Sequence, residues 1–203
     1  MAKWHGFGRC KTRLARDIGK SNSATIQGVM TNHTIKVAKS LQKIKLIDIS
    51  LAISGLGEKN CRRWSKELGI SKFNLQGKGC LGEKMKRQII FNKKYCTHNN
   101  IKNIIFIGTD LPDLCHLDLI NTIRELKRND LILGPSNDGG YWLIGLSTNI
   151  ITKHLNLPFI KIGWSKENVL QNTIDNFAST KLKYKLLDKK IDIDTIFDIE
   201  NRK

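Results

Sequence analysis

Short apolar runs alternate with amphipathic stretches along most of this chain, and this alternation restricts the fold more than any other feature. The clearest run is NIIFIGTD at residues 103–110, followed by DLILGP at 130–135 and YWLIGLS at 141–147. Runs of this length, rich in β-branched residues and bounded by turn signals, are typical of buried strands. Strands that alternate with helices favour the α/β class, with a largely parallel sheet covered by helices on both faces.

Helical periodicity predicts one long helix over residues 23–45, where Ile26, Val37 and Leu41 share a face. Shorter helices and further strands complete the expected order of elements. The helices are predicted at 61–69, 83–96, 117–128 and 166–179, and the strands at 46–54 and 72–76.

Size and composition indicate a single domain over residues 1–203, with 40% hydrophobic residues to build a core. No apolar run approaches the ~20 residues that cross a bilayer, and the start lacks a secretory pattern. These two observations predict a cytoplasmic protein without a membrane partner. The cysteines are odd in number and form no C-x-x-C pair, which favours reduced thiols over a disulfide framework or a structural zinc site. They are Cys10, Cys61, Cys80, Cys96 and Cys115.

The formal net charge of +17 raises nucleic acid as a partner. However, the basic residues are mostly Lys, spread through the chain together with abundant Ile and Asn, as an AT-rich coding bias would produce. No basic block interleaved with base-stacking aromatics stands out. The sequence therefore predicts no specific nucleic-acid binding.

The stretch GFGRCKTR at residues 6–13 gathers glycines and cations before the long helix. It matches neither a Walker loop nor G-x-G-x-x-G, because Cys10 and Lys11 stand where those motifs need glycine. A solvated tail is one interpretation. The other is a phosphate-binding loop, since Arg offers a planar fork and Lys a mobile charge.

Carboxylates follow two of the predicted strands. Asp110 comes directly after the run at 103–107, where a hard oxygen ligand could hold Mg²⁺ or Mn²⁺ beside substrate phosphates. Alternatively Asp110 caps the next helix, although Asp113 is the better candidate for that role. Asp138 precedes Gly139 and Gly140, which make either a simple hairpin turn or a substrate-binding loop.

Near the end, IDIDTIFDIE carries alternating carboxylates. On a short strand Asp192 and Asp194 would share one face, either as a second set of metal ligands or as a surface paired with Lys. The chain shows no nucleophile elbow and no paired-His metal motif.

Six stretches taken together resemble one family in sequence and order. They are GRCKTRLA (8–15), QGKGCLGEKM (76–85), GTDLPDL (108–114), GPSNDGGYWLIGL (134–146), IGWS (162–165) and DIDT (192–195). The resemblance is to the DUF2064 proteins, a glycosyltransferase-like family related to the nucleotidyltransferases that make molybdenum-cofactor dinucleotides and to phospholactate guanylyltransferase.

The resemblance implies a three-layer αβα, GT-A-like nucleotide-diphospho-sugar transferase fold with a mostly parallel mixed sheet. It implies a metal-dependent transferase that takes a nucleotide-sugar or NTP donor and a small-molecule acceptor. Asp110 and Asp138 would be catalytic, and Mg²⁺ or Mn²⁺ would bind Asp110 with Asp192 or Asp194. Contacts to the donor and its phosphates would come from Gly8, Arg9, Lys11, Arg13, Gln76, Gly108, Thr109, Gly139, Gly140 and Tyr141.

The chain departs from the family pattern at three positions: Cys80 replaces the usual Asp, Lys84 the usual Arg, and Phe7 the usual Pro. Glycosyl transfer has two alternatives: a guanylyltransferase-like nucleotidyltransferase that releases pyrophosphate and, suggested by Cys80, a non-catalytic nucleotide-binding protein. Only four residues precede the first loop, so the first strand is expected to be incomplete, with Met1 an internal methionine of a longer protein.

Overall fold

A computed structural model describes residues 1–94, 103–164 and 166–200 and divides the chain into two compact units. Unit 1 consists of Met1–Gln76, Gly108–His116 and Ile191–Lys203. Unit 2 consists of Gly77–Ile107 and Leu117–Lys190. Because the chain passes between the units repeatedly, neither unit is one continuous segment of sequence.

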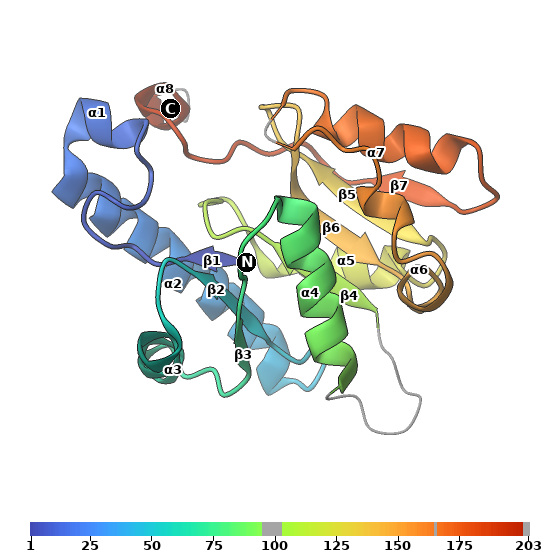
Figure 1. Cartoon of the computed structure of the whole chain (residues 1–203), viewed down its shortest axis with the longest axis horizontal. Helices are drawn as coiled ribbons and strands as arrows, with labels where there is room; N and C mark the ends of the chain where they lie inside the picture. Colours follow the sequence, from blue (N-terminus) through green and yellow to red (C-terminus); the bar gives the residue numbers. More distant parts are fainter. Residues whose placement is uncertain (95–102, 165, 201–203) are drawn as a thin grey trace. The chain divides into compact units, whose positions relative to one another are not determined.

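Unit 1 is built on a parallel three-stranded sheet in the order β1-β2-β3 (Figure 1). Each strand is short, and the helices of the unit contain more residues than its sheet. The strands are β1 (Ala2–Lys3), β2 (Leu51–Ser54) and β3 (Phe73–Leu75), and the helices are α1 (Leu14–Ile18), α2 (Lys20–Lys43), α3 (Glu58–Glu67) and α8 (Ile196–Glu200).

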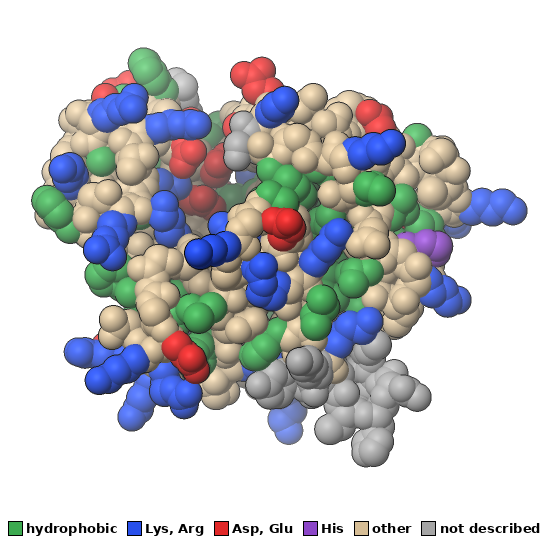
Figure 2. Space-filling model, in the orientation of Figure 1, with side chains coloured by type: hydrophobic (Ala, Val, Ile, Leu, Met, Phe, Trp, Pro, Cys, Tyr) green, Lys and Arg blue, Asp and Glu red, His purple; other side chains and the backbone are tan. Residues whose placement is uncertain are grey.

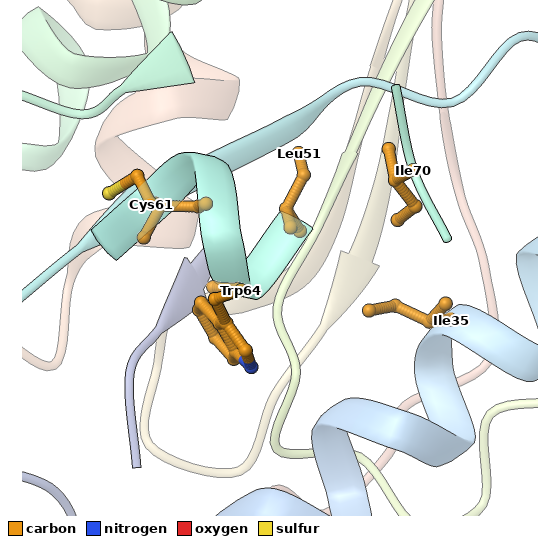
Figure 3. Close-up of a cluster of buried hydrophobic side chains, with 7 residues drawn as sticks. Ile35, Leu51, Cys61, Trp64 and Ile70 are labelled. Carbon is orange, nitrogen blue, oxygen red and sulfur yellow. The ribbon is translucent and has the colours of Figure 1, made fainter. Parts of the chain in front are cut away.

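The core of unit 1 joins both long helices to this sheet. Ile35 of α2 and Trp64 of α3 lie in one buried cluster with Leu51 of β2 (Figure 3). The other members of the cluster are Ala2, Ile53, Cys61 and Ile70. Burial of large apolar side chains contributes most of the stabilisation of such a layer. The burial raises the pKa of the Cys61 thiol, which keeps it protonated within the core.

Unit 2 is built on a mixed four-stranded sheet in the order β4-β6-β5-β7. β6 pairs antiparallel with both β4 and β5, whereas β7 runs parallel to β5. The strands are β4 (Ile104–Ile107), β5 (Leu131–Pro135), β6 (Tyr141–Leu146) and β7 (Tyr184–Leu186), and the helices are α4 (Leu81–Lys94), α5 (His116–Glu125), α6 (Thr148–Lys153), the 3₁₀ turn η1 (Leu157–Phe159) and α7 (Val169–Ala178).

The central strands of this sheet are buried on both faces. Consecutive residues of β5, Leu131, Ile132 and Leu133, are all fully buried, as are Ile144 and Leu146 of β6. A strand buried on both faces reads as a continuous apolar run, which is why the runs at 130–135 and 141–147 were strong signals. The predicted α/β class with a mixed sheet is confirmed.

The prediction of a strand through the alternating carboxylates is wrong. After an isolated bridge between Ser136 and Lys190, residues 191–194 form no regular element, and α8 follows. The Asp198 carboxylate accepts hydrogen bonds from the backbone N–H groups of Asp194 and Thr195 and from the Thr195 hydroxyl, which makes one half of a capping box at the start of α8. Local capping of a helix start therefore overrides the strand-like alternation.

Element boundaries also differ from the predictions. The long helix spans Lys20–Lys43 rather than 23–45, and Lys45 has a left-handed φ of 57°, which ends it. β2 occupies only Leu51–Ser54 of the run at 46–54. The short helices α1 and α6 were missed, and the predicted end of the helix at 83–96 lies outside the described residues.

Lys and Arg side chains are scattered over the face of the molecule drawn in Figure 2 rather than gathered in one block. This distribution agrees with the even spread of Lys along the sequence. Among the described residues, no helix combines the length and the apolarity that a membrane span requires.

Candidate functional site

The loop after β1 adopts a conformation that its glycines permit. The backbone N–H of Arg9 donates to the carbonyl of Gly6 at 2.9 Å, and Gly8 has a φ of 68° within this turn. Lys11 also has a positive φ, 47°, which is uncommon for a residue with a side chain. The backbone O of Lys11 then accepts from the N–H of Ala15 at 2.8 Å, which leads the chain into α1.

The side chain of Lys11 is the centre of a charged cluster in unit 1. Its Nζ lies 3.5 Å from Asp110 Oδ2 and 3.1 Å from Asp194 Oδ1, and it also donates to the backbone O of Ile193. The Lys11 side chain is only 4% exposed, whereas the two carboxylate side chains are 38% and 46% exposed. The ammonium is therefore covered, and the carboxylates that neutralise it reach solvent.

Two further charges belong to this cluster. Arg13 Nη1 lies 3.6 Å from Asp194 Oδ2 and its side chain is 72% exposed. Burial alone would raise the pKa of Asp198, but hydrogen bonds from Asp194 and Thr195, with the charge of Lys11, hold that pKa below its usual value. The cluster thus combines acidic groups with one buried and one exposed cation.

Asp110 is positioned by the segment that follows β4. The carboxylate curls back over Gly108, where an added Cβ would meet Asp110 Oδ1. The buried Thr109 is held in place by Gln27, whose Nε2 donates to both the backbone O and the Oγ1 of Thr109 at 3.2 Å. The backbone N–H of Ile193 donates to the Asp110 carbonyl at 3.0 Å, which ties the two acidic segments together.

The predicted metal ligands come together only in part. Asp110 and Asp194 face the same nitrogen, but no group of three His, Cys, Asp or Glu side chains with metal-binding geometry occurs within the described ranges. Two carboxylates fit a magnesium-type ion, which binds through one or two carboxylates and takes its remaining oxygens from water and phosphates. Asp192 lies in the same irregular segment as Asp194, residues 191–194, and its role stays a prediction.

Gln76 has a structural position in unit 1. It is buried, and its Nε2 donates to the backbone carbonyls of Ala2 and Ala52 at 3.1 Å each. These bonds fasten the neighbouring strands β1 and β2 together. The predicted contact between Gln76 and a donor stays a prediction.

The DGG stretch of unit 2 closes the β5–β6 hairpin. Asp138 Oδ1 accepts from the backbone N–H of Gly140 at 3.0 Å and from the hydroxyl of Ser136. Gly139 has a φ of 80°, and a side chain there would collide with the backbone of Glu167. The hairpin interpretation is thus observed, while the substrate-binding role of this turn stays a prediction.

Tyr141 begins β6 directly after this turn, and burial raises the pKa of its phenol well above the usual range. The side chain is therefore neutral at any physiological pH. Its predicted contact with a donor also stays a prediction.

Cys80 stands at the start of α4 with its side chain exposed. Its backbone N–H donates to Glu83 Oε2 at 2.8 Å, and its carbonyl accepts the first helical bond, from the N–H of Lys84. This is the N-cap position, which Asp fills better than Cys. Cys80 therefore caps this helix less well than an Asp at the same position.

The parts of the site that the sequence did not reveal depend on long-range contacts. The Ile193 carbonyl and the buried Gln27 have no motif of their own. By contrast, Thr195 and Asp198 form a T-x-x-D capping signature that could have been found in the sequence.

Solved structures define the class of fold. A protein from Desulfovibrio desulfuricans G20, provisionally named a nucleotide-diphospho-sugar transferase, matches with a TM-score of 0.77 and 22% identity. That match covers 98% of this chain and 81% of that one. A 4-diphosphocytidyl-2C-methyl-D-erythritol synthase from Anaerococcus prevotii DSM 20548 matches with a TM-score of 0.54 and 13% identity, over 98% and 93% of the two chains.

A homologue of Mycobacterium tuberculosis Rv0371c from Mycobacterium sp. strain JC1 matches with a TM-score of 0.54 and 11% identity, covering 98% of this chain and 91% of that one. At these identities the matches establish the nucleotide-diphospho-sugar transferase fold and nothing more specific. No curated protein matched the chain.

Residues 37–166 match a family described as "Uncharacterized protein conserved in bacteria (DUF2064)". This is more than half of the chain, and the chain belongs to that family. The matched range contains the segments around Asp110 and Asp138 but neither the loop of Lys11 nor the segment of Asp194.

Proposed function

We propose that this protein is a divalent-metal-dependent transferase that takes a nucleotide-activated donor and transfers its sugar or nucleotidyl group to a small-molecule acceptor. The observation that supports it most is the pair of half-exposed carboxylates, Asp110 and Asp194, beside the exposed guanidinium of Arg13. We also propose a cytoplasmic location, which the free thiols among the described cysteines suit.

In this proposal the carboxylates bind the metal and the guanidinium groups bind the donor. Asp110 and Asp194 hold the metal, and Arg13, with the exposed Arg9, binds donor phosphate oxygens. The metal supplies neutralisation of the charge that develops on the phosphates as the bond breaks. Asp138 is assigned to the acceptor, as the family resemblance implies.

A thermal-shift panel of nucleotide sugars and nucleoside triphosphates, with and without Mn²⁺, tests the proposal. A true donor at 100 times its Kd adds about 2.7 kcal/mol to the free energy of unfolding. We expect this stabilisation to require Mn²⁺ and to be lost in Asp110→Asn. Asp175→Asn, an exposed carboxylate on α7, is the matched control and should respond like the wild type.

The proposal fails if no member of the panel stabilises the protein, or if stabilisation is indifferent to Mn²⁺ and to Asp110→Asn. The products then separate the reaction types. Free nucleoside diphosphate indicates glycosyl transfer, and pyrophosphate indicates nucleotidyl transfer.

Nucleotidyl transfer is the second candidate, because the fold is shared with a protein named for a diphosphocytidyl product. The third candidate, a non-catalytic nucleotide-binding protein, is suggested by Cys80. It predicts a donor-induced shift without metal-dependent turnover of any donor.

A further inference from the structure

The carboxylate pair of unit 1 already holds a cation that belongs to the chain. Lys11 Nζ reaches Asp110, Asp194 and the carbonyl of Ile193, so its three N–H donors have three acceptors. A buried ammonium is costly unless it is paired and hydrogen-bonded, and here both conditions are met. The arrangement is therefore stable without any added ion.

The backbone at Lys11 points to a purpose beyond stability. Its φ of 47° is a conformation that costs a residue with a side chain free energy, and the ammonium of this residue is covered and contacts the two carboxylates. Exposed residues of the same loop, Arg9 and Arg13, carry no such strain. Among these three basic residues, the loop thus adopts an unfavourable backbone conformation only at Lys11, whose ammonium contacts the two carboxylates.

A divalent cation shared by the two carboxylates would compete with this ammonium. Both carboxylate oxygens face the same nitrogen, and a metal bound to both would need their negative charge and the space between them. Because the Lys11 side chain is 4% exposed, solvent alone cannot hydrate the ammonium in place. A strong anion close to the loop could draw it away, since a charge-assisted bond to phosphate replaces those to carboxylate.

From these contacts we infer that Lys11 is an internal counter-cation that excludes a divalent ion from Asp110 and Asp194 until donor phosphates attract its ammonium. This inference rests on the proposed function for the identity of the donor. Its consequence is a coupled site: nucleotide and metal each increase the affinity for the other by the same factor. Lys11 then exchanges carboxylate partners for phosphate partners during binding.

Titration of the apo protein with Mn²⁺ alone, followed by calorimetry and by the paramagnetic resonance of free Mn²⁺, tests the exclusion. Lys11→Met removes the charge and keeps the apolar stem, and we expect it to bind Mn²⁺ roughly tenfold tighter than the wild type, within the usual range of coupling. Lys20→Met removes the same charge from an exposed side chain over the Phe7 ring and should leave Mn²⁺ affinity unchanged.

Two additional variants keep the test decisive. Lys11→Gly removes the ammonium and also suits the positive φ, so it serves if Lys11→Met is poorly folded. Combining Lys11→Met with Asp194→Asn should cancel the gain in Mn²⁺ affinity, because one ligand of the pair is lost. Equal Mn²⁺ affinity of the wild type and both Lys11 variants would overturn the inference.

The release step is tested by adding the nucleotide that stabilises the wild type. Nucleotide should raise the Mn²⁺ affinity of the wild type by about the factor gained in Lys11→Met, and raise that of Lys11→Met much less. An equal increase in both proteins would overturn the exchange of partners. Failure of the proposed function gives a different result, because no nucleotide then shifts the thermal stability of the protein. The Mn²⁺ titration without nucleotide still reports whether Lys11 excludes the metal ion from the two carboxylates.

Discussion

At the scale of single residues, conformation and hydrogen bonding decide which of the predicted site residues are available to a ligand. Arg13 is exposed, Lys11 is covered, and the carboxamide nitrogen of Gln76 is engaged by two strand carbonyls. Residue type alone could not distinguish these cases, because all three are polar residues in the stretches that carry the family resemblance.

Gln76→Met tests the structural role of this side chain. Met fills a similar volume but donates no hydrogen bond, so the carbonyls of Ala2 and Ala52 lose a buried partner. We expect the free energy of unfolding to fall by about 1–3 kcal/mol, measured by urea denaturation. If stability is unchanged while donor binding is lost, the side chain acts on the ligand instead.

At the scale of elements, the strong apolar runs were predicted correctly, whereas the strand through the alternating carboxylates was not. β5 and β6 are buried on both faces, so their sequence carries a continuous apolar signal. α8 has five residues, and the backbone N–H groups of Asp194 and Thr195, immediately before it, donate to the Asp198 carboxylate. The alternation of Ile and Asp favoured a strand in this segment, but the segment is irregular and leads into the start of α8.

Asp198→Asn tests the capping box through its pH dependence. The folded-state pKa of Asp198 lies below its ordinary value of about 3.9, so the carboxylate binds protons less readily in the folded protein. Its stabilisation is therefore complete well above pH 4 and is lost as the pH falls toward the lower folded pKa. Hydrogen exchange of the Asp194 and Thr195 amides should report this loss in the wild type.

In Asp198→Asn the protection of these two amides should be weak at neutral pH already and change little on acidification. Glu200→Gln, an exposed change in the same helix, is the control and should behave like the wild type. Unaltered protection in Asp198→Asn would show that the box does not hold α8.

At the scale of the whole molecule, the two compact units are interleaved along the chain. Unit 1 is assembled from three segments and unit 2 from two, so folding of either requires residues from distant parts of the sequence. For this reason the single domain over residues 1–203 stays a prediction. It implies that the two units unfold together in one cooperative transition.

Tryptophan fluorescence can follow each unit separately. Trp4 and Trp64 lie in unit 1, and Trp142 and Trp164 lie in unit 2. Variants that keep only Trp64 or only Trp142, with Phe elsewhere, should unfold in urea with coincident transitions. Midpoints that differ clearly between the two variants would identify two independently folding domains.

The sequence by itself determined the α/β class, the order of the main elements and the family. These properties can be predicted from local patterns: apolar runs, helical periodicity, and glycine turns whose backbone requirements do not depend on distant residues. It also marked Lys11, Asp110 and Asp194 as chemically important, although only as separate motifs.

Only the tertiary structure decided how those three residues meet. They are separated by most of the length of the chain, and no local pattern records that one buried ammonium lies between two exposed carboxylates. That arrangement follows from the packing of distant segments and the left-handed backbone at Lys11. It places the ammonium of Lys11, which the family resemblance assigns to donor phosphates, against two carboxylates.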